Sequence, residues 1–221
     1  MARRSDQDPA WWTWHQVTWL WGNAMTEIRP EDDLPAWRRY KRAERLAARD
    51  LMSAARRQEV AAALALHLDR LLVERGLLRP GLILSGYWPI RAEPDLRPWM
   101  LALEAHGLHL ALPVVETRAA PLVFRRWTKG AAMERGHWNI LVPAAPGHVR
   151  PDISLAPLVG WDRKGYRLGY GGGYFDRTLA ALDPRPFTIG VGFHSAELTS
   201  IHPQPHDIGL DAIVTEEGLQ V

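Results

Sequence analysis

The segment Arg167-Leu-Gly-Tyr-Gly-Gly-Gly-Tyr-Phe-Asp176 is a glycine-rich stretch between two predicted regular elements. A short apolar run ends near Val159 and Gly160, and a helical pattern begins at Tyr174. A glycine-rich loop that opens a helix brings backbone N–H groups and the positive end of the helix dipole to one place, which suits a phosphate group. The segment therefore predicts an anion-binding loop between a strand and a helix.

The residues in and beside this loop indicate which kind of ligand it could bind. No Gly-Lys-Ser/Thr follows, so the segment is not a Walker A motif. The first strand of the chain does not lead directly into it, so it is not a clean dinucleotide fingerprint either. Arg167 on one flank and Asp176 on the other favour a nucleotide with a metal ion over a flexible turn or a helix cap. Four glycines can take positive φ and let a ligand approach the backbone, namely Gly169, Gly171, Gly172 and Gly173.

Strands and helices alternate outward from this loop. Short apolar runs predict strands over residues 82–87, 108–115, 122–127, 153–159, 188–193 and 212–215. Helical patterns cover residues 37–75 with a break near Ser53, residues 95–106 and residues 174–182. Apolar positions near helical spacing in the first of these are Leu46, Leu51, Val60, Leu64, Leu68 and Leu71. This order predicts a three-layer α/β/α domain with a mostly parallel central sheet, preceded by a helical N-terminal segment.

Residues 1–36 differ in composition from the rest of the chain. They carry a group of tryptophans and then an acidic, proline-bearing stretch, so we interpret them as a Trp-rich extension and linker before a single domain over residues 37–221. One helical face would join Trp14, Val17, Thr18 and Trp21. Simple surface packing of this segment, or translation from Met25, are alternatives that the sequence leaves open.

The composition excludes several classes of protein. With 221 residues, 47% of them hydrophobic, the chain can bury a core, and with no cysteine it has neither disulfides nor a cysteine nucleophile. No apolar run reaches the roughly 18 residues of a membrane helix. A net charge of +2 gives no reason to expect a nucleic-acid partner. We therefore expect a cytoplasmic protein, monomeric and without a membrane partner.

A basic stripe and a set of carboxylates are the other candidates. Arg38, Arg42, Arg45 and Arg49 share one helix face and could clamp a polyphosphate or polyglutamate, track a nucleic acid, or form a solvated surface. Asp176, which lies in the first turn of a helix, could bind Mg²⁺ or simply complement the helix dipole, and Asp207 could be a second carboxylate. Glu93, beside Trp88, could hydrogen-bond a planar heterocycle, or could cap a turn.

Several of these segments together resemble the 5-formyltetrahydrofolate cyclo-ligase family, also called methenyltetrahydrofolate synthetases. The resemblance covers residues 37–216 and includes five motifs in order. They are Trp88-Pro-Ile-Arg-Ala-Glu93, Gly136-His-Trp-Asn-Ile140, Pro157-Leu-Val-Gly-Trp-Asp162, Arg167 to Asp176, and Pro205-His-Asp207 through Asp211.

The resemblance implies a reaction that depends on ATP and Mg²⁺. 5-Formyltetrahydrofolate becomes 5,10-methenyltetrahydrofolate, and ADP and phosphate are released. The formyl oxygen attacks the γ-phosphate, and N10 then closes the ring as phosphate leaves. Such a reaction asks mainly for positioning and charge neutralisation, so it needs no protein nucleophile.

The resemblance also implies roles for individual residues. Arg38 and Arg42 would bind ATP phosphates, with Lys41 and Arg45 as an alternative register. Arg167 and Asp176 would be catalytic, and Asp176 and Asp207 would bind Mg²⁺. Folate would contact Trp88, Glu93, Trp138, Tyr170 and Tyr174. The ATP loop would consist of Arg167, Leu168, Gly169, Tyr170, Gly171, Gly172, Gly173, Tyr174 and Phe175.

The chain departs from the family pattern at several positions. Some members carry Arg and Lys in the glycine loop where this chain has Tyr170 and Gly172, so Arg167, Arg125 and Arg126 become candidates for contact with the γ-phosphate. A non-catalytic paralogue that binds a folate or a nucleotide is therefore an alternative. An RNA-associated protein that uses the basic helix is a third hypothesis.

Overall fold

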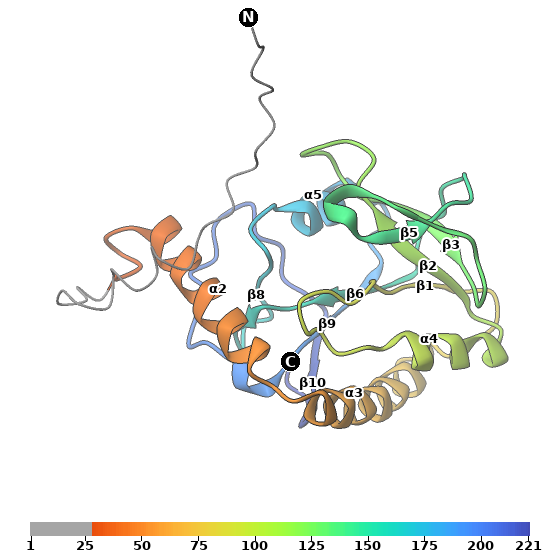
Figure 1. Ribbon diagram of the computed structural model, residues 1–221, viewed down its shortest axis with the longest axis horizontal. Coiled ribbons are helices and arrows are strands. Elements are labelled where there is room, and N and C mark those ends of the chain that lie inside the picture. Colours follow the sequence, from red (N-terminus) through yellow and green to blue (C-terminus); the bar gives the residue numbers. More distant parts are fainter. Residues whose placement is uncertain (1–27) are drawn as a thin grey trace, which may run out of the picture.

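The computed structural model describes residues 28–221 and is built around one large sheet. Its order is β11-β10-β9-β6-β1-β2-β3 (Figure 1). The strands are β1 (Ile83–Ser85), β2 (His109–Val114), β3 (Val123–Trp127), β6 (Ile153–Pro157), β9 (Phe187–Val191), β10 (Ala212–Thr215) and β11 (Gly218–Leu219). Strands β10, β9, β6, β1 and β2 run parallel, whereas β3 and β11 pair antiparallel at the two edges. The prediction of a mostly parallel sheet is confirmed.

Helices cover both faces of this sheet. They are α2 (Leu34–Asp50), α3 (Ala54–Glu74), α4 (Arg97–Leu103) and α5 (Tyr174–Ala181). Figure 1 shows α3 and α4 below the sheet and α5 above it, while α2 lies to the side, next to β8 (Arg167–Leu168). The described residues thus form the three layers that the alternation of elements predicts.

The break in the long N-terminal helical region follows from a capping residue. The Ser53 side chain accepts a hydrogen bond from the backbone N–H of Arg56 and starts α3. Asp33 caps α2 in the same way, so α2 begins at Leu34 rather than at residue 37. Leu51 was predicted on the apolar face, but it follows the last residue of α2 and is 88% exposed.

Other elements differ from the prediction in length or direction. The helix predicted over residues 95–106 is α4 followed by a 3-10 turn, Glu104–His106, which ends at Gly107 with a φ of 79°. The strand predicted over residues 122–127 is β3, which runs antiparallel to β2. Five short strands were not predicted: β4 (Met133–Arg135), β5 (Leu141–Pro143), β7 (Gly160–Trp161), β8 (Arg167–Leu168) and β11.

Apolar residues of α3 and the sheet form the core. Val60, Leu64 and Leu68 of α3 are fully buried in the same cluster as Leu155 and Ile213 of the central strands. Burial of apolar surface contributes about 25 cal/mol per Å². This core holds the ends of the parallel strands in fixed positions, and the loops that follow them are placed accordingly.

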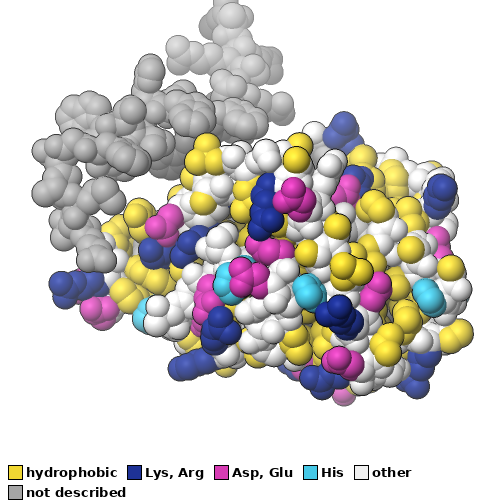
Figure 2. Space-filling model, turned by 90° about the horizontal axis from the view of Figure 1, so that it is seen from below, with side chains coloured by type: hydrophobic (Ala, Val, Ile, Leu, Met, Phe, Trp, Pro, Cys, Tyr) yellow, Lys and Arg dark blue, Asp and Glu magenta, His cyan; other side chains and the backbone are white. Residues whose placement is uncertain are grey.

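The surface carries both signs of charge. On the face shown in Figure 2, lysine and arginine side chains are interspersed with acidic ones and no large patch of one sign gathers there. None of the described helices is long and apolar enough to cross a membrane. The predicted Trp-rich helical face and the possible start at Met25 lie outside the described residues.

Candidate active site

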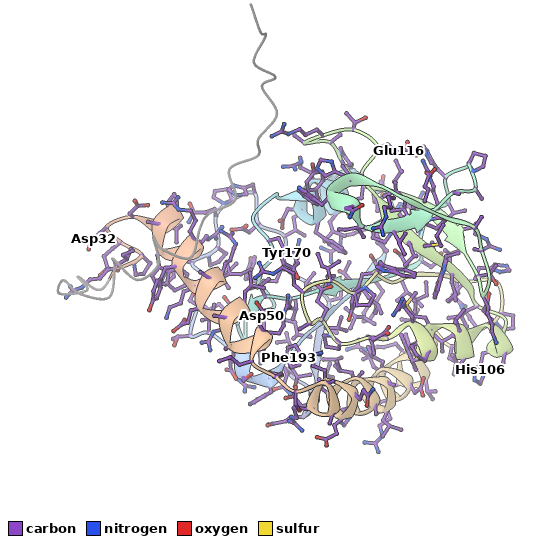
Figure 3. The ribbon with its side chains drawn as sticks, viewed as in Figure 1. Asp32, Asp50, His106, Glu116, Tyr170 and Phe193 are labelled. Atoms are coloured by element: carbon purple, nitrogen blue, oxygen red, sulfur yellow. The ribbon has the colours of Figure 1, made fainter. Side chains whose placement is uncertain are left out.

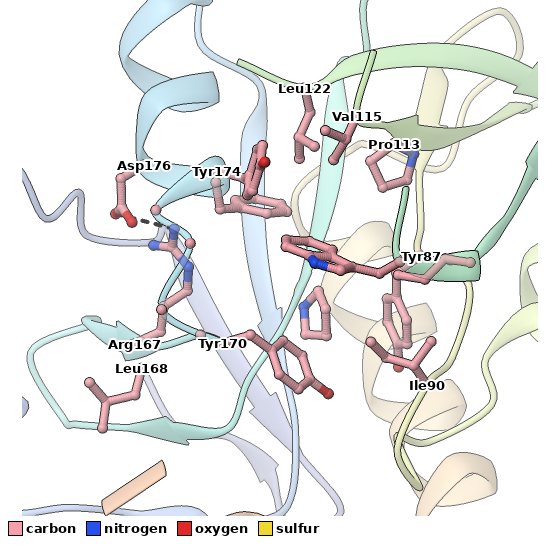
Figure 4. Close-up of a pocket in the computed structure, with 18 of the residues that line it drawn as sticks. Tyr87, Ile90, Pro113, Val115, Leu122, Arg167, Leu168, Tyr170, Tyr174 and Asp176 are labelled. Atoms are coloured by element: carbon pink, nitrogen blue, oxygen red, sulfur yellow. Dashed lines mark ion pairs between the residues drawn. The ribbon is translucent and has the colours of Figure 1, made fainter. Parts of the chain in front are cut away.

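A pocket of about 720 Å³ lies at the carboxyl ends of the parallel strands. Pro157 ends β6, Pro113 lies near the end of β2, and Tyr87 follows β1, and all three line the pocket. Ligands of open α/β sheets bind at this edge because the loops that follow the strands meet there. Figure 4 shows Leu122, Val115 and Pro113 on one side of the pocket, across from Arg167 and Asp176.

The glycine loop forms one side of the pocket. It follows β8 rather than the strand that ends near Val159, because the hairpin of β7 and β8 intervenes. Gly171 has a φ of +94° and Gly173 a φ of +63°. Gly173 is the N-cap of α5 and provides no side-chain acceptor, so the first N–H groups of this helix are left for another acceptor. The loop thus has the backbone of an anion-binding cradle.

The prediction of positive φ is wrong for the other two glycines of the loop. Gly169 and Gly172 have negative φ or extended backbone. A Cβ atom at residue 172 would nevertheless lie 2.8 Å from Cδ2 of Tyr174, so close contact, rather than backbone conformation, requires glycine there. A Cβ placed at Gly169 would meet no atom of the described residues within 4 Å beyond its two chain neighbours.

Two arginine–aspartate pairs frame this cradle. Nη2 of Arg38 lies 2.6 Å from Oδ2 of Asp207, and both side chains are nearly buried. Nη2 of Arg167 lies 3.2 Å from Oδ1 of Asp176, the pair drawn in Figure 4. Arg42 donates from Nε to the carbonyl oxygen of Gly169 at 2.8 Å and thereby ties α2 to the glycine loop.

The electrostatics of this half of the pocket favour an anion. Burial lowers the pKa of Arg42, and the positive charge of Arg38 lowers it further. Burial also lowers the pKa of Arg167, although Asp176 opposes that shift. Burial alone would raise the pKa of Asp207, but hydrogen bonds from Arg38 and from the Gln204 N–H hold it below its usual value. Positive charges that are close together and partly desolvated are stabilised when an anion binds between them.

The two aspartates fit a magnesium ion that binds together with phosphates. Oδ1 of Asp176 accepts a hydrogen bond from the N–H of Ile208, the residue after Asp207, at 3.0 Å. Within residues 28–221 there is no group of three or more His, Cys, Asp or Glu side chains that could hold a metal. Mg²⁺ commonly takes only one or two carboxylates and completes its shell with water and substrate phosphates.

The structure distinguishes between the two registers of the basic pair. Arg38 and Arg42 line the pocket. Lys41 instead contacts Glu44, and Arg45 donates to the carbonyl oxygens of Ser195 and Glu197. The geometry favours the Arg38 and Arg42 register.

Arg125 and Arg126 do not belong to the site. Arg125 forms ion pairs with Glu116 and Glu134, at 2.9 and 2.8 Å. Neither arginine lines the pocket. Of the three candidates for contact with the γ-phosphate, only Arg167 lines the pocket, so the geometry favours Arg167.

Aromatic side chains and one buried carboxylate form the other half of the pocket. Trp88 stacks edge-on against Trp127, and Trp138 stacks edge-on against Tyr174 with 5.4 Å between ring centroids. Trp138 is 61% exposed, so a face of its indole is free for a ligand. Glu93, 6% exposed, accepts hydrogen bonds from the Ile90 N–H and the Tyr170 hydroxyl.

Apart from the alternatives Lys41, Arg45, Arg125 and Arg126, the pocket brings together the predicted site residues, and their individual roles stay predictions. They are Arg38, Arg42, Trp88, Glu93, Trp138, Arg167, Leu168, Gly169, Tyr170, Gly171, Gly172, Gly173, Tyr174, Phe175, Asp176 and Asp207. Sequence reasoning did not single out Tyr87, which donates from its buried hydroxyl to the Pro94 carbonyl, or His137, which packs on Trp138. Their positions directly after β1 and next to a predicted tryptophan were the available signals.

The fold and the pocket define an α/β protein whose ligand site lies at the carboxyl edge of a parallel sheet. Residues 35–216 match the model of the 5-formyltetrahydrofolate cyclo-ligase family. The chain belongs to this family, as its motifs predicted, and is an enzyme of that kind.

Individual relatives agree with this assignment. A 5-formyltetrahydrofolate cyclo-ligase of Mycolicibacterium smegmatis is 30% identical over 148 residues, which are 63% of this chain and 76% of the relative. The enzyme of that name from Escherichia coli is 43% identical over 131 residues, 56% of this chain and 71% of the relative.

Solved structures show the same fold. The 5,10-methenyltetrahydrofolate synthetase of Aquifex aeolicus superposes with a TM-score of 0.70 at 25% identity, and covers 83% of this chain and 91% of its own. A synthetase of the same name from Mycoplasma pneumoniae gives a TM-score of 0.65 at 21% identity, over 81% of this chain and 98% of its own.

Proposed function

We propose that this chain converts 5-formyltetrahydrofolate and ATP into 5,10-methenyltetrahydrofolate, ADP and phosphate, with Mg²⁺ bound beside the nucleotide. One observation carries the proposal: a single pocket joins a cationic, glycine-lined half to an aromatic half that contains a buried carboxylate. A triphosphate suits the first half and a pterin ring suits the second. The two substrates would thus meet where the halves adjoin.

The proposed chemistry has two steps. The formyl oxygen attacks the γ-phosphorus and ADP leaves, which activates the formyl carbon. N10 then attacks that carbon and gives up its proton to water or to the departing phosphate, and the former formyl oxygen leaves as part of inorganic phosphate. Both steps depend on alignment of the reacting atoms and neutralisation of charge rather than on a protein nucleophile.

The residues of the pocket have distinct parts in this scheme. Arg38 and Arg42 neutralise phosphate oxygens, and the glycine loop donates backbone N–H groups to them. Arg167 orients Asp176, and Asp176 and Asp207 would hold Mg²⁺, which supplies further positive charge on the phosphates when it is bound. Glu93 accepts hydrogen bonds from the donor edge of the pterin, while Trp88 and Trp138 pack on flat rings.

An absorbance assay tests the proposal directly. The purified chain is mixed with 5-formyltetrahydrofolate and MgATP at mildly acidic to neutral pH, and the methenyl product is followed with time. We expect product only when both ATP and Mg²⁺ are present. Folded protein that binds the folate but gives no product would instead favour a non-catalytic paralogue, which the absence of a cation at Tyr170 and Gly172 motivates.

A further inference from the structure

Three side chains from distant parts of the chain form a continuous line of hydrogen bonds behind the pocket. Nη2 of Arg49, near the end of α2, donates to the hydroxyl of Tyr170 at 2.5 Å. The same hydroxyl donates to Oε1 of Glu93 at 2.7 Å. Figure 4 shows the Tyr170 side chain directed away from Arg167 and Asp176, and Figure 3 shows where Tyr170 and Asp50 lie in the fold.

Arg49 is a buried arginine, so contact with solvent does not explain its position. It is 4% exposed, does not line the pocket, and donates from Nη1 to the carbonyl oxygen of Leu158 at 3.4 Å. Its guanidinium also lies 5.8 Å from the centroid of the Tyr170 ring. A buried charge is costly unless it is paired, and the carboxylate of Glu93 is the negative charge at the other end of this line.

The Tyr170 hydroxyl, in the middle of this line of hydrogen bonds, has a fixed protonation state. Burial raises the pKa of the Tyr170 hydroxyl far above its usual value, and the Glu93 carboxylate raises it further. The hydroxyl therefore stays protonated at neutral pH. It accepts from Arg49 and donates to Glu93, so the direction of both hydrogen bonds is set.

The charge of Glu93 depends on its surroundings. Burial raises the pKa of this carboxyl, while the Ile90 N–H, the Tyr170 hydroxyl and the Arg49 charge lower it. Tyr87 also lies close, and burial together with the Glu93 charge raises its pKa, so that it stays neutral. Without Arg49 and the Tyr170 hydroxyl, mainly the Ile90 N–H would oppose the rise in the pKa of Glu93 that burial causes.

We infer that Arg49 and Tyr170 are positioning residues that keep Glu93 ionised and oriented for the donor edge of the pterin. The inference rests on the proposed function and adds a specificity device to it. Tyr170 belongs to the glycine loop, and Arg49 belongs to the helix that carries Arg38 and Arg42. The Glu93 carboxylate is therefore held by the same two elements that form the anion cradle. An ion pair between Arg91 and Asp50, at 3.2 Å, links the end of α2 to the Glu93 segment a second time.

Equilibrium binding of 5-formyltetrahydrofolate to the full chain, measured by calorimetry without ATP over pH about 5 to about 8, tests the inference. An ionised acceptor is required, so affinity falls as pH drops through the pKa of Glu93. In Arg49→Met that pKa rises, and the loss of affinity should shift to higher pH. At pH about 6.5 we expect folate affinity to fall by at least about tenfold, while ATP affinity changes by less than about twofold.

Further variants separate positioning from folding. Tyr170→Phe removes a single hydroxyl from a partly exposed side chain and should give the same shift in the pH profile. The double variant should lose little more than either single variant, because both act through one line. Arg49→Lys should recover part of the affinity. Arg45→Met is the matched control, since Arg45 anchors the same helix on backbone carbonyls but does not line the pocket.

The outcomes are distinguishable. Folate affinity and a pH profile equal to those of the wild-type protein in both Arg49→Met and Tyr170→Phe would overturn the inference. Equal losses of folate and ATP affinity, with the same change in Arg45→Met, would overturn it too, since they indicate a structural role only. Wild-type protein that does not bind 5-formyltetrahydrofolate at all would overturn the proposed function itself.

Discussion

The carboxylate of Asp176 has two contacts that a substitution can separate. It is paired with Arg167 and accepts a hydrogen bond from the Ile208 N–H. Asp176→Asn retains an oxygen acceptor but removes the charge and a proposed ligand of Mg²⁺. We expect kcat to fall at least about tenfold, or about 1.4 kcal/mol in the barrier, and the half-saturating Mg²⁺ concentration to rise. Initial rates over a Mg²⁺ titration measure both quantities.

Glu59→Gln is a suitable control for that experiment. Glu59 lies on the exposed side of α3, and among the charged groups of residues 28–221 it pairs with Arg56 alone. The Glu59→Gln variant should have the same kcat and the same Mg²⁺ dependence as the wild-type protein. If Asp176→Asn also kept both, Asp176 would have no role with the metal.

Gly171 is a residue whose backbone matters to the cradle. Its φ of +94° strains any residue with a side chain, and a Cβ there would lie 3.4 Å from the guanidinium of Arg42. Gly171→Ala should raise the KM for ATP at least about fivefold, at a cost in stability of about 1–2 kcal/mol. Steady-state kinetics and urea unfolding measure the two effects.

Gly130→Ala isolates the effect of strain. Gly130 has a φ of +76° with open space around its Cα, and it lies outside the pocket. We expect a similar loss of stability with an unchanged KM for ATP. An increase in KM as large as that of Gly171→Ala would mean that lowered stability, and not the cradle, determines ATP affinity.

Single residues of the site differ in how far the sequence reveals them. The glycine loop and Asp176 are local in sequence, so a motif identifies them. The sequence leaves Arg125 open as a candidate because its partners Glu116 and Glu134 come from a neighbouring loop and from the short strand β4, which the sequence does not predict. Conversely, the role of Arg49 depends on its contact with Tyr170, which is 121 positions away in the chain.

Helix α2 is the element that joins the two halves of the pocket. Its first half carries Arg38 and Arg42 to the cradle, and its last turn carries Arg49 to the Glu93 side. It ends at Asp50, shortly before Ser53, the N-cap of α3. Because one helix carries residues for both halves, a shift of α2 would move both halves of the site together.

The N-cap of α3 provides a test at this level. Ser53→Ala removes the acceptor for the Arg56 N–H and should lower the free energy of unfolding by about 1 kcal/mol. Activity per folded molecule should stay close to the wild-type value, because Ser53 does not line the pocket. Urea unfolding measures the free energy of unfolding. Ser53→Asp restores an acceptor and should therefore recover the wild-type free energy of unfolding. Unchanged stability in Ser53→Ala would show that the cap contributes nothing.

The longer a helix or strand is, the more clearly the sequence predicts it. The apolar pattern of α3 extends over 21 residues and identifies it clearly, whereas β7 and β8 have two residues each, too few for any periodicity. The direction of β3 depends on its partner β2, which no local pattern encodes. Leu51 fits the apolar spacing but lies beyond the last residue of α2, where the helical face no longer exists.

At the scale of the whole molecule, the pocket uses residues from Arg38 to Asp207, and the family match begins at residue 35. Deletion of residues 1–24 should therefore leave kcat, both KM values and the melting temperature close to those of the full chain. Kinetics and thermal unfolding of the shortened protein measure this. Loss of folding after the deletion would show that the tryptophans of this segment belong to the core.

The ion pair between Arg38 and Asp207 joins positions 169 residues apart. During synthesis on a ribosome, the sheet strands up to β9 can emerge and begin to pair before Asp207 has been translated. The cradle cannot close until that residue is released, because Arg38 has no earlier acidic partner in the pocket. A contact of such sequence separation forms late in folding. Nascent chains that are truncated before Asp207 should thus be unable to retain a nucleotide. Because they also lack β10 with its buried Ile213, the core and the cradle are completed together at the end of synthesis.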